Sequence, residues 1–401
     1  MKNKYFYPLT SDNLRNKDLM AASKVLSSRQ LTMSKVTRNF EDVFKKKLNL
    51  NYSLMVNSGS SANLLALQCL INPYRKKRLR HGDEVLIPSV CWSTSLWPII
   101  QSGLKPIFVD VDPNTLNISI EDLKSKISKK TKALMLIHVL GNAVNMDKLL
   151  KIVNQKKLIL IEDTCESLGS KFKKKYLGNF GHFSTFSFYY SHQITSAEGG
   201  MISCKSSEDF EILKALRSHG YSRVLKNKKK IEKKYSKIDS RFLFTNSGFN
   251  FRPTEMQAAI GLSQFKSLNE FARKRSINRK KIIQSLTKDK LWKNQVSFLN
   301  ANKDVKASWF GLPLLLNKKY INKKTKIIKK LNNFGIDTRP IISGNFARQP
   351  AIKKYKILKK GMSFPNADYV NDLGFFIGLP TKNISFKLLK KFKNFFFKSF
   401  N

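Results

Sequence analysis

A histidine stands at the centre of the most chemically active segment of this chain, which reads FSFYYSHQITSAEGG over residues 186–200. An imidazole has an ordinary pKa near ~6.5, so His192 can act as a general base near neutral pH. Imidazole does not form a lasting Schiff base with an aldehyde. No lysine stands beside His192, since Lys173 to Lys175 lie upstream. His192 could therefore act as a base at this point of the chain, but it could not hold an aldehyde covalently.

A second candidate group is the carboxylate at the end of a strand-like, apolar segment. Residues 158–163 read LILIED, and Glu166 follows three residues later. In open α/β sheets, ligands gather outside the carboxyl ends of the strands. Asp163 could there stabilise a protonated ring nitrogen, as a pyridine cofactor requires. The alternative is that Asp163 only caps a helix.

A serine-rich turn forms the third candidate, with the sequence NSGSSAN over residues 57–63. Gly59 permits a tight turn, and Ser60 and Ser61 offer hydroxyls and backbone N–H groups at the start of a helix. Such a helix start binds anions, because unpaired N–H donors and the helix dipole point at the same place. The alternative is an ordinary serine N-cap.

Alternating strands and helices must position these groups. Short apolar runs predict strands over Ser53–Val56, Glu84–Pro88, Pro106–Val111, Ala133–Val139, Leu158–Asp163, Ser184–Tyr189 and Gly200–Cys204. Helical patterns between them cover Ala62–Leu70, Ser93–Ser102, Ile120–Ile127 and Met146–Val153. This alternation predicts an α/β fold with a mostly parallel sheet covered on both faces.

The pattern changes in the last third of the chain. A long helical pattern over Pro253–Leu286 bridges to shorter strands and helices, so we expect a large α/β domain over 1–265 and a smaller α+β domain over 266–401. In Phe386–Phe397 the apolar residues share one helical face. An amphipathic helix of this kind could lie on a membrane surface. Packing against its own domain is the commoner outcome.

Composition excludes several classes of protein. The 401 residues are 41% hydrophobic, which argues against a disordered chain. No run approaches the ~20 apolar residues of a membrane span, and the start lacks the apolar region of a secretory signal. The four cysteines have no disulfide-framework or metal-type spacing, and only Cys204 lies beyond residue 166, so we expect no metal centre and a cytoplasmic location.

The charge balance raises a separate question, because 75 Lys and Arg residues face 27 Asp and Glu residues, for a net charge of +48. Such an excess could bind nucleic acid. The lysines, however, are spread along the whole chain, and no DNA- or RNA-binding motif accompanies them. We therefore expect no nucleic-acid partner, and a positive field that attracts anionic substrates.

Together, the three segments resemble the DegT/DnrJ/EryC1/StrS sugar aminotransferase family of pyridoxal phosphate (PLP) enzymes, which includes the nucleotide-sugar 3-dehydratases. Ordinary members carry a lysine that binds the cofactor where this chain has His192, and the 3-dehydratases carry a histidine. The likeness spans nearly the whole chain, with further motifs in the same order: YPL at 7–9, LTM at 31–33, Trp92, RSHG at 217–220, GFNFRP at 248–253, SWFG at 308–311 and RPIISGNF at 339–346. It implies an aspartate aminotransferase-like architecture, that is, fold type I.

The resemblance also implies a role for each matching residue. Gly59, Ser60, Ser61 and Ser187 would bind the cofactor phosphate, joined by Asn250 from a second subunit of a homodimer. Trp92 would stack on the pyridine ring, Asp163 would pair with the ring nitrogen, and Glu166 would lie near the ring hydroxyl or amine. His192 would be the catalytic base. His219, Arg252 and Arg339 would bind glutamate or the sugar, or else form structural hydrogen bonds or ion pairs, and Arg223 would meet the diphosphate.

The expected activity follows from the 3-dehydratase subgroup. Glutamate would convert non-covalently bound PLP to pyridoxamine phosphate (PMP), and the 3-hydroxyl would then leave a nucleotide-linked 4-keto-6-deoxyhexose, with GDP favoured by overall likeness. The product would feed a 3,6-dideoxy sugar such as colitose. Two alternatives remain open: a conventional nucleotide-sugar aminotransferase, and a catalytically silent basic scaffold. Several relatives have two consecutive histidines where this chain has His192-Gln193, so the second position is an open question.

Overall fold

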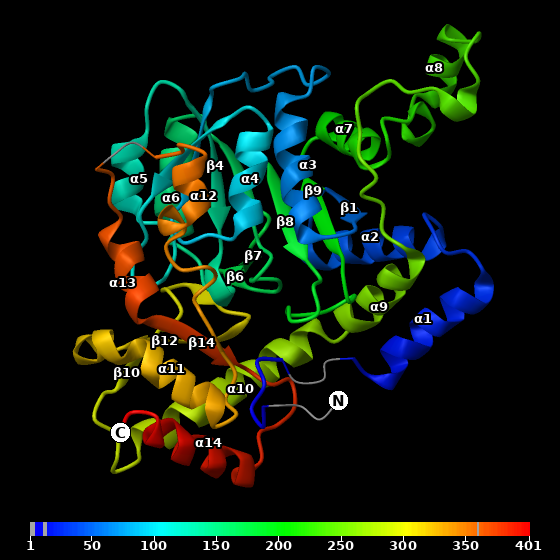
Figure 1. The fold of residues 1–401 in the computed structure, drawn as a ribbon. Coiled ribbons are helices and arrows are strands. Elements are labelled where there is room, and N and C mark those ends of the chain that lie inside the picture. The colour runs from blue at the N-terminus through cyan, green and yellow to red at the C-terminus, as the bar shows by residue number, and fades with distance from the viewer. Residues whose placement is uncertain (1–4, 11–13, 359–360) are drawn as a thin grey trace.

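A seven-stranded mixed sheet forms the centre of the molecule in the computed structural model, which describes residues 5–10, 14–358 and 361–401 (Figure 1). Six strands are parallel to one another, and β9 alone runs in the opposite direction. In spatial order the strands are β1 (Tyr52–Val56), β9 (Gly200–Cys204), β8 (Phe183–Ser187), β5 (Ile159–Asp163), β4 (Thr131–Ile137), β2 (Glu84–Pro88) and β3 (Lys105–Val109). The expected mostly parallel sheet is confirmed, and each strand lies within two residues of its predicted bounds.

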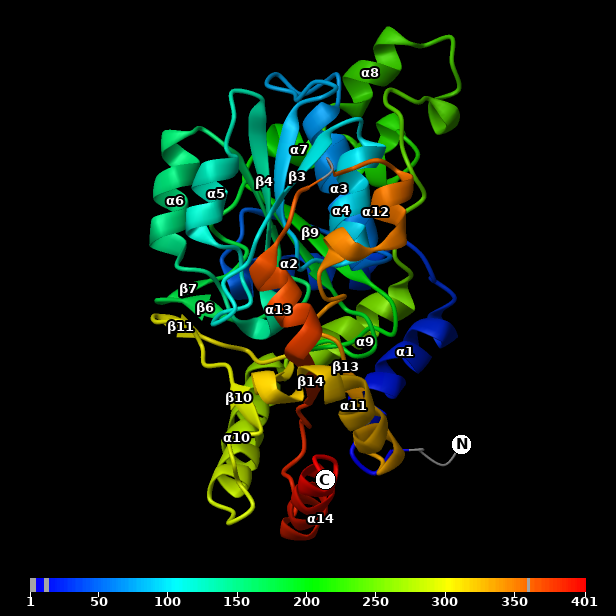
Figure 2. The ribbon, with the colours of Figure 1, turned by 60° about the vertical axis from the view of Figure 1, so that its left-hand side comes forward.

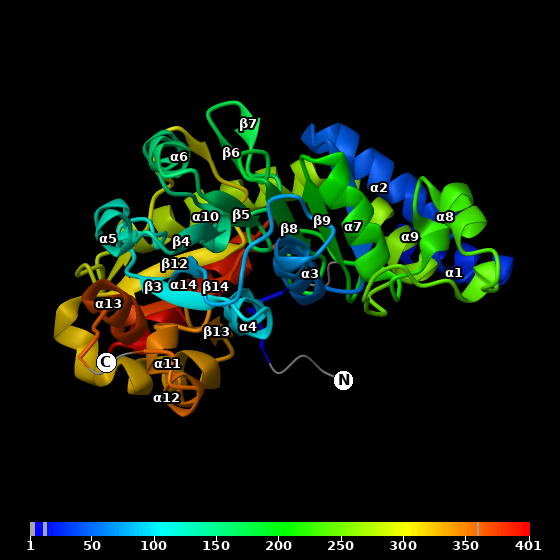
Figure 3. The same ribbon diagram turned by 90° about the horizontal axis from the view of Figure 1, so that it is seen from above.

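Alternate residues of these strands enter different cores, as a two-residue strand repeat requires. Ala133 and Met135 of β4 enter one core, whereas Leu134 and Leu136 enter the core on the opposite face. The first face is covered by α3 (Gly59–Ile71), α4 (Ser93–Gln101) and α7 (Ser207–Arg217), and the second by α5 (Ile120–Lys126) and α6 (Met146–Gln155). Seen from above, α3 and α6 lie on opposite sides of the sheet (Figure 3).

Strand β9 sits between β1 and β8 and is antiparallel to both. Its first residue, Gly200, therefore lies beside the last residues of its neighbours, Val56 and Ser187. A Cβ at Gly200 would lie 2.4 Å from the carbonyl carbon of Ser58, so glycine allows this close approach. The loop between β8 and β9 thus starts and ends at the edge of the sheet where α3 begins.

The N-terminal helices lie at the β1 side of the sheet. Helix α1 (Asn16–Ser28) packs on α9 (Glu255–Phe265), and α2 (Lys35–Leu48) packs on both α9 and β1. The short helix α8 (Lys228–Lys234) has no buried residue and projects from the body of the molecule (Figure 1). It belongs to a lysine-rich segment of the chain between α7 and α9.

A second, antiparallel sheet forms the C-terminal part, below the central sheet in Figure 2. Its strand order is β10 (Val296–Phe298), β12 (Gly311–Leu316), β14 (Gly374–Gly378) and β13 (Thr338–Arg339). The accompanying helices are α11 (Lys324–Asn333), α12 (Pro350–Lys354), α13 (Pro365–Leu373) and α14 (Phe386–Lys398). A small sheet of β11 (Val305–Lys306), β6 (Lys171–Phe172) and β7 (Lys175–Tyr176) joins the two parts. The expected smaller α+β part is confirmed.

The helical pattern expected over Pro253–Leu286 is two helices and not one. Helix α9 ends at Phe265, and α10 (Leu268–Thr287) begins after the turn at Lys266 and Ser267. The α10 helix links both parts of the molecule. Its Phe271 packs in the core beneath β8 and β9, and the amide of its Asn278 donates to the carbonyls of Pro380 and Lys382.

Helix α14 packs against its own chain, as the commoner interpretation of its apolar stripe predicts. Phe392, Phe396 and Phe397 are buried in the C-terminal core. The ring of Phe392 lies 4.8 Å from that of Tyr7. This stripe is therefore covered and is not available to a membrane surface.

Within the described residues, no helix is long and apolar enough to cross a membrane. The same part of the chain contains no group of three or more His, Cys, Asp or Glu side chains placed to hold a metal ion. All four cysteines are free thiols. Residues 1–4 and 11–13, which belong to the start examined for a signal sequence, lie outside the described residues.

Candidate active site

A cavity of about 460 Å³ opens at the carboxyl ends of β1, β5 and β8. This is the edge at which an open α/β sheet binds its ligands. Eight of the residues singled out in the sequence line the cavity: Gly59, Ser60, Trp92, Asp163, Glu166, Ser187, His192 and Arg339. These residues come from both sheets, and Gly59 and Arg339 are 280 positions apart in the sequence (339 − 59).

The serine-rich turn begins α3, but its capping residue is Ser58. The Ser58 hydroxyl accepts a hydrogen bond from the backbone N–H of Ser61, at 3.0 Å, and also contacts the Ser61 hydroxyl. Ser61 is therefore occupied in the cap and does not line the cavity, whereas Ser60 does. The turn therefore contains an ordinary serine N-cap, and Ser58, which forms it, lines the cavity together with Ser60.

Gly59 lets the start of α3 approach the end of β8. A Cβ at this position would lie 2.6 Å from the Cβ of Ser187 and 3.0 Å from the sulfur of Cys165. The first distance is too short for a Cβ atom, and the second would require the sulfur to move. The absence of a Cβ leaves the first N–H groups of α3 and the Ser187 hydroxyl on one side of the cavity, as an anion site requires.

Of the two carboxylates that end β5, only Asp163 lines the cavity. One oxygen accepts hydrogen bonds from the Asn63 amide at 2.9 Å and the Ser95 hydroxyl at 2.8 Å, and the other accepts the Cys165 N–H. Glu162 is fully buried, and it accepts the N–H groups of residues 178, 180 and 181. The helix-cap alternative for Asp163 is wrong, because no helix begins there.

The carboxyl group of Glu166 is about half protonated at neutral pH. Its carboxylate accepts the backbone N–H of Leu140 at 3.0 Å. Burial, together with the nearby carboxylate of Asp163, raises the pKa of Glu166 to about 7. It can therefore hold or release a proton beside a bound ligand.

The ring of His192 stands between two aromatic rings. Tyr189 contacts it edge-on with 5.8 Å between ring centroids, and Phe310 does so at 5.1 Å. Its Nδ1 atom is buried and has no hydrogen-bond partner among the described residues. Burial, and to a lesser degree the positive charge of Arg275, lower the pKa of His192 to about 3. The imidazole is therefore neutral at pH 7, as a general base must be.

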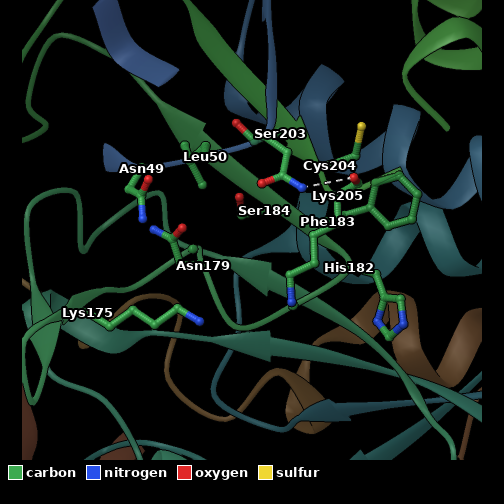
Figure 4. Close-up of a pocket in the computed structure, with 13 residues that line it drawn as sticks. Asn49, Leu50, Lys175, Asn179, His182, Phe183, Ser184, Ser203, Cys204 and Lys205 are labelled. Carbon is green, nitrogen blue, oxygen red and sulfur yellow. Dashed lines mark hydrogen bonds between the residues drawn. The ribbon is translucent and has the colours of Figure 1, made fainter. Parts of the chain in front are cut away.

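No lysine lines this cavity in the part of the chain that the structure describes. Two lysines that flank strands β8 and β9 in sequence, Lys175 and Lys205, lie at the opposite end of β8. They line a separate cleft of about 220 Å³ with His182 (Figure 4). The length of the strand therefore separates these amines from Asp163 and His192.

Gln193 follows His192, at the position whose role the sequence left open. It is buried, and its amide donates to the backbone carbonyls of Glu166 and Ser308. It does not line the cavity. The residue after His192 thus links the backbone segments around the site and does not face a ligand.

Four predicted residues lie outside the cavity and close to one another. The guanidinium of Arg252 contacts His219 at 3.1 Å and the side-chain oxygen of Asn250 at 2.9 Å. Arg223 lies over the ring of Tyr221, which in turn contacts His219. We call Asn250, Arg252, His219 and Arg223 the outer cluster. Within one chain it does not contribute to the lining of the cavity.

Several residues of the site were not found from the sequence. Asn63 and Ser95 fix Asp163, and Tyr189 and Phe310 flank His192. A signal existed for the first two, because each follows a predicted ligand residue by about one helical turn. Phe310 lies in the SWFG motif at 308–311, but the motif alone gave it no role at the site.

The lining residues match the parts of PLP. Trp92 offers a half-exposed aromatic face for a ring. Asp163 offers an anchored carboxylate for a ring nitrogen, and the cradle left by Gly59 offers N–H and hydroxyl donors for a phosphate. This donor set fits the cofactor that the resemblance implies.

The comparisons with known proteins agree with the site. Residues 12–380 match the DegT/DnrJ/EryC1/StrS aminotransferase family. The chain is 38% identical, over 93% of its length and 95% of the relative's, to the GDP-4-keto-6-deoxy-D-mannose 3-dehydratase of Escherichia coli O55:H7. It is similar to two solved structures of such dehydratases. The E. coli enzyme with bound hydrated PLP has a TM-score of 0.89 at 35% identity, covering 98% of this chain and 99% of the other. An enzyme with a trapped PLP-glutamate geminal diamine has a TM-score of 0.88 at 35% identity, covering 98% and 100%.

Fold, cavity and sequence likeness agree over nearly the whole chain, which therefore belongs to the DegT/DnrJ/EryC1/StrS aminotransferase family.

Proposed function

We propose that this protein is a PLP- and glutamate-dependent 3-dehydratase that acts on a nucleotide-linked 4-keto-6-deoxyhexose, with GDP-4-keto-6-deoxymannose as its substrate. One observation carries the proposal: a neutral histidine lines the cofactor-type cavity, and no lysine does so among the described residues. A relative of the same length with 38% identity bears the name of this activity.

When bound, the PMP form of the cofactor supplies an amine that condenses with the 4-keto group of the sugar and a ring that accepts electrons. Asp163 holds the ring nitrogen in its protonated form, because Asn63, Ser95 and the Cys165 N–H fix its carboxylate. His192 would take a proton from the 4′ carbon of the bound cofactor, and the hydroxyl of carbon 3 would leave the sugar as hydroxide, which gains a proton to become water. Hydrolysis would then return PLP and release ammonia and a 3-deoxy-4-keto sugar.

Other residues bind and orient. Trp92 stacks on the ring, Gly59, Ser60 and Ser187 bind the phosphate, and Glu166 exchanges a proton near the ring substituents. Ser61 supports this turn through Ser58. Arg339 presents a half-exposed guanidinium at the mouth of the cavity, suited to a carboxylate of glutamate or an oxygen of the sugar.

We further propose a homodimer in which Asn250 of the outer cluster reaches the phosphate region of the partner's cavity, with His219, Arg223 and Arg252 beside it. The exposure of Asn250 and the distance of the outer cluster from the cavity of its own chain support this arrangement. A cytoplasmic location is part of the same proposal, supported by four free thiols.

A conventional aminotransferase is the alternative within the same family. Its lysine would recapture the cofactor after amine transfer and yield an amino sugar. A catalytically silent scaffold would not need an anchored Asp163 opposite an unpaired, neutral His192. Both alternatives predict no release of ammonia from a 4-keto sugar.

Replacement of the base tests the proposal directly. In His192→Asn we expect ammonia release to fall at least about a thousandfold, in the range seen when a general base is lost, while PLP binding stays within a few-fold. The wild type should give a PMP-type absorbance band after glutamate is added, and no adduct that survives borohydride and denaturation.

Undiminished turnover by His192→Asn would refute the role of the histidine. A panel of GDP-, CDP-, UDP- and dTDP-linked 4-keto sugars, compared by ammonia release, identifies the nucleotide. Efficient turnover of a non-GDP sugar alone would correct the substrate without changing the reaction.

A further inference from the structure

Directly behind the catalytic histidine lies a buried arginine that has no acidic partner. Arg275, in the middle of α10, is 3% exposed. Its guanidinium donates to the backbone carbonyls of Gln193, at 3.1 Å, and of His192, at 3.3 Å. No carboxylate of the described residues lies within ion-pair distance of it, and its Nε atom has no hydrogen-bond partner there.

This arrangement differs from that of Arg217, the other buried arginine of the described residues, and from that of Arg75, which is partly buried. Arg217 pairs with Glu41 at 2.9 Å, and Arg75 pairs with Asp209 at 2.8 Å. A buried, unpaired charge is costly, so its neighbours must compensate for it or a function must retain it. Burial alone lowers the pKa of Arg275 to about 10, which still leaves it charged at neutral pH. A full positive charge therefore stands behind the segment that carries the imidazole.

We propose that Arg275 is a positioning residue for His192: it fixes the backbone of residues 192 and 193 from behind the cavity, and its positive charge adds to the effect of burial in disfavouring protonation of the imidazole. This inference rests on the proposed role of His192 as the base. It assigns to α10 a part in the reaction, although no α10 residue lines the cavity.

Other charged groups also line the cavity. Asp163, Glu166, Glu198 and Arg339 line the same cavity as His192, as do the Tyr189 hydroxyl and the Cys165 thiol. The carboxylates would favour a protonated imidazole, and yet the pKa of His192 is lowered, by burial first and by Arg275 second. The guanidinium therefore opposes the acidic side of the cavity.

Histidine NMR of the full-length protein tests the charge. The chain has only five histidines, and the signal of His192 is the one lost in His192→Asn. In Arg275→Gln we expect the pH at which the His192 Cε1 signal departs from its neutral position to rise by about one unit, as for the loss of a nearby like charge. In Arg275→Lys, which keeps the charge, this pH should stay at the wild-type value.

Kinetics test the positioning. In Arg275→Lys a single ammonium replaces a fork that reaches two carbonyls, so we expect kcat to fall about tenfold with KM nearly unchanged, as for a misplaced catalytic group. In Arg275→Gln the acidic limb of the kcat/KM profile should also move to higher pH. A purely structural arginine would lower kcat in both variants without moving that limb.

Arg279→Gln is the matched control. Arg279 lies one turn further along α10, over the ring of Trp309, and donates to the Leu299 carbonyl. Its loss should leave the His192 signal and the acidic limb unchanged. Circular dichroism at each pH confirms that every variant is folded.

Three outcomes would overturn the inference. The first is that the His192 Cε1 signal of folded Arg275→Gln leaves its neutral position at the same pH as in the wild type. The second is that Arg275→Lys keeps the wild-type kcat. The third is that Arg279→Gln moves the pH of the His192 signal as far as Arg275→Gln does. If Arg275→Gln does not fold, Arg275→Met carries the test of charge. Turnover that survives in His192→Asn would instead refute the proposed function, so the two failures are distinguishable.

Discussion

At the scale of single residues, the cavity favours the neutral forms of both Glu166 and His192. Burial raises the pKa of Glu166 to about 7 and lowers that of His192 to about 3. Strongly shifted pKa values in one cavity mark a candidate functional site. At pH 7 Glu166 is about half protonated, and the imidazole of His192 is neutral, so its unpartnered nitrogen can accept a proton. Asp163 differs from both, since three hydrogen bonds hold its carboxylate in place.

Glu166→Gln should make the cofactor-free protein more stable above pH 7. A carboxyl whose pKa is raised by folding contributes stability below its unfolded pKa, near 4.5, and loses it as the pH rises through about 7. The amide oxygen of glutamine can still accept the Leu140 N–H. Relative to the difference at pH 4, we expect the variant to gain about 3 kcal/mol over the wild type at pH 8, measured by urea unfolding.

Glu198→Gln is the control for that prediction, because Glu198 lines the same cavity but is exposed. It should change the free energy of unfolding by less than about 0.5 kcal/mol at either pH. An equal stability difference at pH 4 and pH 8 in Glu166→Gln would contradict the raised pKa.

At the scale of elements, α14 depends on its covered face. Phe392→Ala should lower the free energy of unfolding by about 3–5 kcal/mol, because the fully buried ring leaves a cavity beside Tyr7. Chemical denaturation followed by circular dichroism measures the loss. The matched variant Phe386→Ala removes the same ring from a position that is 83% exposed on the same helix. It should have nearly no effect, and equal losses in both variants would show that the helix is packed differently.

The elements that alternate regularly are those the sequence predicts well. The strands β4 and β5 are apolar on both faces, and short turns separate them from their helices, so their bounds needed no tertiary information. The break between α9 and α10 could not be predicted in this way. No glycine or proline stands at Lys266 or Ser267, and the turn there depends on packing against neighbouring elements.

Within the site, residues at strand ends could be predicted from the residues around them, whereas Trp92 and Arg339 were predicted only from the family resemblance. Asp163 and Ser187 end strands, and the position of His192 follows from the segment around it. In the serine turn, the sequence could not choose between three serines as the cap, since each has the same hydroxyl. Arg275 is one of many cationic residues of α10, and only the fold shows which of them is buried.

At the scale of the whole molecule, electrostatic repulsion opposes the compact state. With 75 cationic and 27 anionic side chains, even one-to-one pairing of every carboxylate would leave a net charge of +48. Salt screens repulsion between exposed charges that are further apart than about 10 Å at 0.1 M. The same field should draw an anionic nucleotide sugar towards the protein.

Moderate salt should therefore stabilise this protein. Between about 0.02 and 0.2 M NaCl we expect the free energy of unfolding to rise by on the order of 1 kcal/mol, as screening weakens repulsion. Urea unfolding at several salt concentrations measures the change. KCl should give the same rise at equal ionic strength. A fall in stability with either salt would mean that ion pairs outweigh repulsion.

The reversed direction of β9 has a consequence for the segment that carries His192. Because β8 and β9 form a closed antiparallel pair, the segment that carries His192 is a hairpin connection with both ends secured by Ser187 and Gly200. Side chains in such a connection can be exchanged without altering the order of the strands or the cores on either face. The group at position 192 can thus be replaced within one connection while the strands and both cores keep their arrangement.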